Sequence, residues 1–136
     1  MPDKKLAALV AAIIILSLGH DIDHWVRGDF RLRLTGETVL VFAAVFAKYA
    51  IFGSGLYLYL KGKVGPLFWV MLAGIGVVLG TLAHFTPFSY QTARSIYRAY
   101  ETPLAGAAAV SVLALLMLAL IAAAAYAQYL RARKSK

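Results

Sequence analysis

Long apolar runs, separated by short polar segments, dominate the pattern of this chain. Four such runs occur, and they extend over Leu6 to Gly19, Val39 to Leu60, Val64 to Ala83 and Leu104 to Ala127. Three of them are long enough to cross about 30 Å of hydrocarbon at about 1.5 Å per helical residue. Because lipid cannot satisfy backbone polar groups, each crossing segment has to be helical. The pattern therefore predicts an all-α integral membrane protein.

The first apolar run is too short to cross a membrane by itself. It ends at Gly19, directly before His20, so we expect its helix to continue through the following polar residues to about Trp25. A cleaved signal peptide is the competing interpretation, but the residues before Gly19 make a weak small-x-small cleavage site. We therefore predict an uncleaved first span that brings polar residues into the outer layer of the membrane.

Capping and helix-breaking residues set the expected bounds of the helices. Glu37 and Thr38 can begin the second helix, Gly65-Pro66 separates the second from the third, and Thr102-Pro103 begins the fourth. Gly76-x-x-x-Gly80 is typical of close helix packing. The predicted fold is a single domain over residues 1–136, with four transmembrane helices in an up-down bundle. The expected spans are about 5–26, 38–60, 64–84 and 103–128.

Composition and charge support this class and exclude others. With 62% apolar and 15% charged residues and no cysteine, the chain is neither a soluble domain nor a disulfide scaffold. The net charge of +8 marks the ends of the spans rather than a nucleic-acid partner. The side that holds both termini and the second connection carries eight basic residues and one acidic residue, whereas the other loops carry five of each. The positive-inside rule then predicts cytoplasmic termini and, for a bacterial cell, the inner membrane.

All three histidines of the chain are predicted to reach one membrane face. His20 and His24 are spaced i, i+4, which places two imidazoles on one side of the first helix, and His84 ends the third span. Counted by helix rise from the opposite boundary, the three lie in one layer at about 21 to 30 Å. Asp21 and Glu37 are the carboxylates best placed to add a fourth ligand. We therefore expect a metal site made of His20, His24 and His84, with Asp21 or Glu37 beside them.

Several interpretations of this cluster remain open. Imidazoles and a carboxylate suit zinc, copper or iron, and the lack of cysteine excludes thiolate sites. A b-type haem between two histidines is a second option, and a proton relay is a third. The simplest alternative is an interfacial helix end in which Asp21 and Asp23 pair with Arg27. If the metal supports turnover, Asp23 is our candidate for the catalytic base.

Lys48 is a second unusual feature, because it lies near the middle of the second apolar run. A lysine at that depth needs a partner, and by helix rise we expect no carboxylate of this chain at the same level. Lys48 would then bind an anion or a cofactor such as an aldehyde, line a proton path, or pair with an acidic residue of another subunit. The simplest alternative is a neutral amine that is hydrogen-bonded to backbone carbonyls.

The remaining features assign no reaction. The segment from Phe85 to Tyr100 is expected to form a short interfacial helix, which either binds lipid head groups or covers the histidines. No phosphate-loop, dinucleotide-binding, zincin or serine-hydrolase motif is present. The sequence thus predicts a small membrane protein that binds a metal ion at its extracytoplasmic face, for redox or Lewis-acid chemistry. The alternatives are an accessory subunit of a larger membrane complex, a haem-binding bundle, or a small oligomeric transporter.

Overall fold

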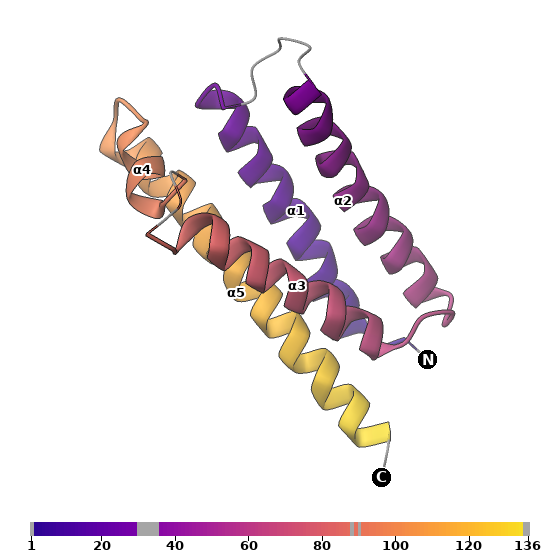
Figure 1. The fold of residues 1–136 in the computed structure, drawn as a ribbon. Coiled ribbons are helices and arrows are strands. Elements are labelled where there is room, and N and C mark those ends of the chain that lie inside the picture. Colours follow the sequence, from indigo (N-terminus) through magenta and orange to yellow (C-terminus); the bar gives the residue numbers. More distant parts are fainter. Residues whose placement is uncertain (1, 30–35, 88, 90, 135–136) are drawn as a thin grey trace.

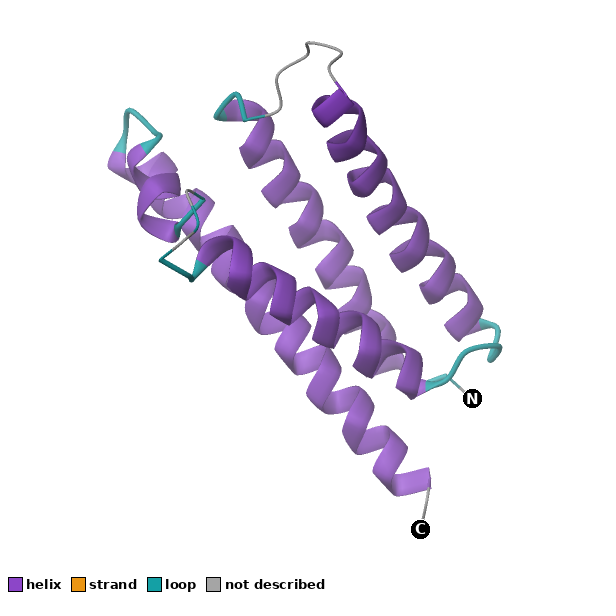
Figure 2. Ribbon diagram, viewed as in Figure 1, coloured by secondary structure: helices purple, strands orange, loops and turns teal. Residues whose placement is uncertain are grey.

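Helices are the only regular secondary structure in the described part of the chain. A computed structural model describes residues 2–29, 36–87, 89 and 91–134, and within these ranges five α-helices and no strand occur (Figures 1 and 2). They are α1 (Lys4–Val26), α2 (Gly36–Leu60), α3 (Pro66–His84), α4 (Ala93–Arg98) and α5 (Pro103–Lys134). All but α4 are long and apolar enough to cross a membrane. The prediction of an all-α protein with four candidate spans is confirmed.

The first helix does continue past its apolar run, through His20 to Val26. Asp3 caps its beginning by accepting bonds from the backbone N–H groups of Lys5 and Leu6. The bond from Leu6 is the main cause that lowers the pKa of this exposed carboxyl below its ordinary value. The hydroxyl of Tyr126 near the end of α5 donates to the same carboxylate. Both termini therefore lie at one end of the molecule, as Figure 1 also shows.

The core lies where α1, α3 and α5 pack together. Leu6 and Val10 of α1, Trp69 of α3 and Ala123 of α5 are fully buried. In Figure 1, α3 and α5 run side by side, and α2 stands at the edge beside α1. The surface of the molecule is correspondingly apolar, as expected for helices in contact with lipid.

The glycine pair of α3 brings that helix close to α5. A Cβ atom at Gly80 would lie 2.6 Å from Sδ of Met117, and one at Gly76 would lie 3.0 Å from Leu120. Neither distance leaves room for a larger side chain without a shift of its neighbour. The close packing predicted from the Gly-x-x-x-Gly spacing is confirmed, and it fixes α3, with His84 at its end, against α5.

The end of α1 is folded by a Schellman motif that positions the loop after it. Gly28 has φ of 76°, a left-handed conformation that glycine adopts without a steric penalty. Its N–H donates to the carbonyl of Trp25, and the N–H of Asp29 donates to the carbonyl of His24, both at 3.0 Å. The chain thus turns back over the last turn of α1 and brings Asp29 beside His24.

Candidate metal centre

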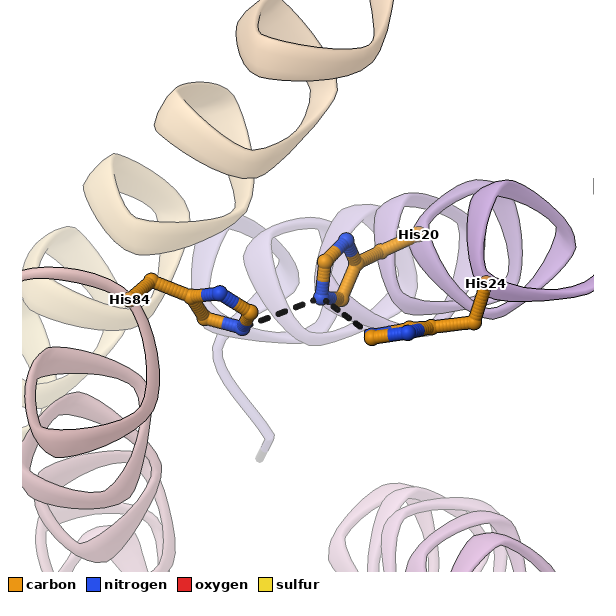
Figure 3. Close-up of side chains that lie close together, drawn as sticks. All are labelled: His20, His24 and His84. Carbon is orange, nitrogen blue, oxygen red and sulfur yellow. Dashed lines mark hydrogen bonds between the residues drawn. The ribbon is translucent and has the colours of Figure 1, made fainter. Parts of the chain in front are cut away.

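Three imidazole rings meet at one end of the bundle, as expected from the sequence. Nε2 of His20 lies 3.2 Å from Nε2 of His84 and 3.3 Å from Nε2 of His24. One ring nitrogen from each of the three residues falls within 4.8 Å of the others. Figure 3 shows the rings from α1 and α3 turned toward one another. His20 and His84 are buried and His24 is half-buried, so the cluster is largely shielded from its surroundings.

Two of the rings are held by their outer nitrogens. Nδ1–H of His84 donates to the backbone carbonyl of Gln91 at 2.7 Å, and Nδ1–H of His24 donates to Oδ2 of Asp29 at 3.0 Å. Arg27 lies 3.2 Å from the same nitrogen of His24, but a guanidinium can only donate, and its acceptors here are the carboxylates of Asp23 and Asp29 and the side-chain oxygen of Gln91. Protonation at Nδ1 leaves a lone pair on Nε2, which is the ligand form of histidine. Both lone pairs point toward the shared centre.

His20 is the ring whose two nitrogens cannot both be hydrogen-bonded in either neutral tautomer. Its Nδ1 is buried and has no hydrogen-bond partner in the described part of the chain. Oδ2 of Asp23 lies 3.9 Å from this nitrogen, which is too distant for a hydrogen bond. With a proton on Nδ1, the Nε2 lone pair of His20 faces two further lone pairs. With a proton on Nε2, the buried Nδ1 of His20 has no hydrogen-bond donor, and the single N–H can donate to only one of the two neighbouring imidazoles.

A cation at the shared centre would resolve this conflict. Zinc binds imidazole at about 2.0–2.1 Å with tetrahedral angles, which places neighbouring ligand nitrogens about 3.3–3.4 Å apart. The two separations measured from His20, 3.2 and 3.3 Å, are close to that edge length, and one nitrogen from each of the three rings lies within 4.8 Å of the others. The donor set and its geometry therefore fit a transition metal ion with three histidine ligands.

Asp23, the predicted catalytic base, lies outside the ring of ligand nitrogens. One carboxylate oxygen accepts bonds from Arg27, with the guanidinium Nη2 at 2.8 Å, and the other accepts the hydroxyl of Tyr100 at 2.6 Å. Burial and this bond to a carboxylate raise the pKa of Tyr100 to about 12, so the hydroxyl remains a donor. Arg27 also donates to the side chain of Gln91. The structure thus surrounds Asp23 with donors and places its Oδ2 3.9 Å from Nδ1 of His20, beyond hydrogen-bond distance.

Asp21 turns away from the histidines toward α2. Nζ of Lys48 lies 2.8 and 2.7 Å from its two oxygens, and the hydroxyl of Tyr49 donates to one of them at 2.6 Å. The expectation that no carboxylate of this chain reaches Lys48 is therefore wrong. That expectation was based on the depth of the backbone alone. The long side chain of Lys48 extends to the level of Asp21. Glu37 belongs to α2, but its side chain lies outside the described residues.

Four contributing residues escaped sequence reasoning: Asp29, Gln91, Tyr100 and Tyr49. A signal existed for the first, because glycine four residues after His24 and directly before Asp29 is the pattern of a Schellman turn. Gln91 and Tyr100 lie in the segment from Phe85 to Tyr100, which we expected to be an interfacial helix, and the structure shows that this segment contacts the site. These contacts depend on the packing of α4, with its buried Ile96, against α5. The local sequence pattern does not predict that packing.

An apolar cavity adjoins the cluster. It has a volume of about 440 Å³ and reaches from His20 and His84 down between α2 and α3 to Phe52 and Leu72. Its only charged wall residue in the described part of the chain is Lys48. The histidine layer therefore forms one end of a space whose other walls are mainly hydrocarbon.

Comparison of the chain with protein-family profiles, curated proteins and solved structures finds no match. We therefore infer the function of this protein from the geometry of the histidine site.

Proposed function

We propose that this protein is a small polytopic membrane protein that binds one transition metal ion through Nε2 of His20, His24 and His84. The convergence of these three nitrogens at 3.2 and 3.3 Å is the observation that carries the proposal. The outer hydrogen bonds to Gln91 and Asp29 support it, because metal-bound histidines ordinarily donate their second N–H in this way. The bare Nδ1 of His20 supports it further, since protons alone leave the cluster unsatisfied.

Zinc is the ion that the donor set suits best, with copper and iron as the competing ions. Three neutral imidazoles in a compact arrangement match a catalytic zinc site, in which a fourth position is left for water or substrate. A haem fits less well. Its two axial ligands lie on opposite faces of a flat macrocycle, whereas His20 and His84 approach each other directly and His24 occupies the space beside them.

An open fourth position would supply Lewis-acid chemistry, or redox chemistry if the ion is copper or iron. The residues of this chain would then hold the ligands in place. Asp29 and the Gln91 carbonyl orient two rings, and Asp23 stands behind the third. Asp21 is engaged with Lys48 and Tyr49, so we propose no metal bond for it.

We further propose that the site lies at the extracytoplasmic face of the inner membrane. The excess of basic residues beside both termini and in the connection between α2 and α3 supports this orientation. An up-down bundle with cytoplasmic termini then places the histidine layer on the opposite side. The lipid bilayer is the partner that the apolar surface requires.

The accessory-subunit alternative loses one of its arguments. It drew on Lys48 having no internal counter-ion, and the structure gives this residue Asp21. The transporter alternative needed Lys48 to line a path, and its ammonium group is instead paired with that carboxylate. Association with other membrane subunits or with further copies of this chain remains a prediction from the sequence.

Metal analysis of the purified, tag-free protein tests the proposal. We expect close to one equivalent of bound metal after exposure to zinc and dialysis, and loss of that metal in His20→Ala and in His84→Ala. Tyr49→Phe is the matched control, because it removes a hydroxyl from the neighbouring Asp21 cluster and leaves the imidazoles unchanged. Absence of stoichiometric metal in the folded protein, or its retention in both histidine variants, would overturn the proposal.

A further inference from the structure

The cavity beside the histidines has a shape and a position that suit a molecule from the bilayer. Ile51 of α2 and Ile75 and Leu79 of α3 line it and are themselves exposed. The cavity is therefore open sideways, between two helices whose outer surfaces are apolar. In a membrane this opening faces hydrocarbon, and a volume of about 440 Å³ is within the range of small-molecule sites.

The two ends of the cavity differ in chemistry. One end is formed by His20 and His84, and the other by Phe52, Leu72 and neighbouring apolar side chains. Along α3, Leu72 and His84 are twelve positions apart, which corresponds to about 18 Å of helix rise. An elongated ligand with one polar end and a long apolar tail matches this arrangement.

Charge indicates which polar group the metal end would take. Three neutral imidazoles would leave the charge of a divalent ion uncompensated in apolar surroundings, where an unbalanced charge is costly. The carboxylates nearby balance only part of this charge, because Asp23 and Asp29 share Arg27 and Asp21 pairs with Lys48. No acidic side chain lines the cavity in the described part of the chain. An anionic oxygen ligand at the fourth position would supply the missing charge.

We propose that the cavity binds a long-chain carboxylate, with its head group on the fourth position of the metal and its hydrocarbon tail between α2 and α3. This inference rests on the proposed metal site. The ligand enters laterally from the bilayer, and its methyl end lies near Phe52. The ring of Phe52 lies 6.1 Å from that of Trp69, centroid to centroid, so a bound tail ends beside a buried tryptophan.

This position of Trp69 makes binding measurable. The chain has two tryptophans, and Trp25→Phe leaves Trp69 as the only one. In that background, reconstituted in phosphatidylcholine nanodiscs, the probe is stearate with a nitroxide near its methyl end, which quenches fluorescence at short range. Its methyl ester is the matched neutral probe. We expect the zinc-loaded protein to be quenched at about tenfold lower concentration of the acid than of the ester, because a charge-assisted bond is lost in the ester.

Two variants of α2 separate the cavity from the surrounding lipid. Ala47 lines the cavity, whereas Ala50 is exposed on α2 outside it. We expect Ala47→Phe to abolish the preference for the acid by filling the space, and Ala50→Phe to retain it. Removal of zinc with a chelator should also abolish the preference, because Lys48, the charged residue that remains on the cavity wall, is already paired with Asp21.

The metal content of the same samples distinguishes the two claims. If zinc is bound stoichiometrically but acid and ester quench equally, or Ala47→Phe and Ala50→Phe behave alike, the carboxylate inference is overturned and the metal site stands. A preference that persists unchanged after zinc removal also overturns it, because the head group is then not on the metal. If no zinc is bound by the folded protein, the proposed function itself fails.

Discussion

At the scale of single residues, two rings of the histidine cluster depend on the groups behind them. His24 is oriented by Asp29 and His84 by the carbonyl of Gln91. The i, i+4 spacing of His20 and His24 predicted that the two would share a helix face, and it could not predict those partners. Asp29 lies beyond the end of α1 and reaches His24 only through the turn at Gly28.

Replacement of Asp29 by alanine tests this dependence. We expect Asp29→Ala to weaken zinc binding about 10- to 100-fold, because the His24 ring loses the acceptor that fixes its tautomer, while folding is retained. Competition with a chromophoric chelator measures the change. Glu101→Ala is the control, since it removes an exposed carboxylate elsewhere. Equal affinities for the two variants would show that Asp29 does not orient a ligand.

The ion pair of Lys48 and Asp21 gives a second prediction for single residues. Lys48→Met should lower the free energy of unfolding by about 1–3 kcal/mol, because it strands a largely buried carboxylate. This loss of stability is smaller than that expected for a fully buried ion pair, because 32% of the lysine side chain is exposed. The double variant Lys48→Met, Asp21→Asn should recover most of the loss in reversible unfolding in detergent. Additive losses in the double variant would show that the two side chains do not interact.

At the scale of elements, the short segment between α3 and α5 connects the bundle to the site. Thr92 caps α4, with Oγ1 accepting the N–H of Ser95 at 3.2 Å, and Gln91 and Tyr100 on either side of α4 contact His84 and Asp23. Gly106 of α5 permits this approach, because a Cβ atom there would lie 2.5 Å from the backbone carbonyl oxygen of Tyr97.

Gly106→Ala is therefore expected to displace α4 and weaken the site. A backbone atom cannot move aside as a flexible side chain can, so the whole segment has to shift. We expect lower stability and weaker zinc binding together, measured by thermal unfolding and chelator competition. Gly53→Ala is the matched control, because a Cβ atom at Gly53 meets nothing within 4 Å, and alanine favours the helix. Full zinc affinity in Gly106→Ala would separate α4 from the function of the site.

At the scale of the whole molecule, hydrophobic pattern alone predicted the helices, and geometry between helices was needed for the rest. The four apolar runs required spanning helices because lipid leaves no other structure for them, and the short first run correctly required α1 to extend past His20. The meeting of His84 with His20 followed from helix rise. The partner of Lys48 did not, because the backbone depth of Lys48 differs from that of Asp21 and only the reach of the side chain joins them.

The orientation in the membrane yields a prediction at the same scale. The chain contains no cysteine, so single cysteines report topology without a background. We expect Lys63→Cys to react with a membrane-impermeant maleimide only from the cytoplasmic side, and Arg98→Cys only from the opposite side. The measurement compares intact spheroplasts with inverted vesicles. Labelling of both positions from one side would contradict the proposed orientation.

X-ray absorption spectroscopy of zinc-loaded, tag-free protein tests the central claim most directly. The account predicts one zinc ion per chain with three imidazole nitrogens at about 2.0–2.1 Å and one further light ligand, and a loss of imidazole scattering in His20→Ala. A spectrum of six oxygen ligands without imidazole, or one unchanged in His20→Ala, would contradict it.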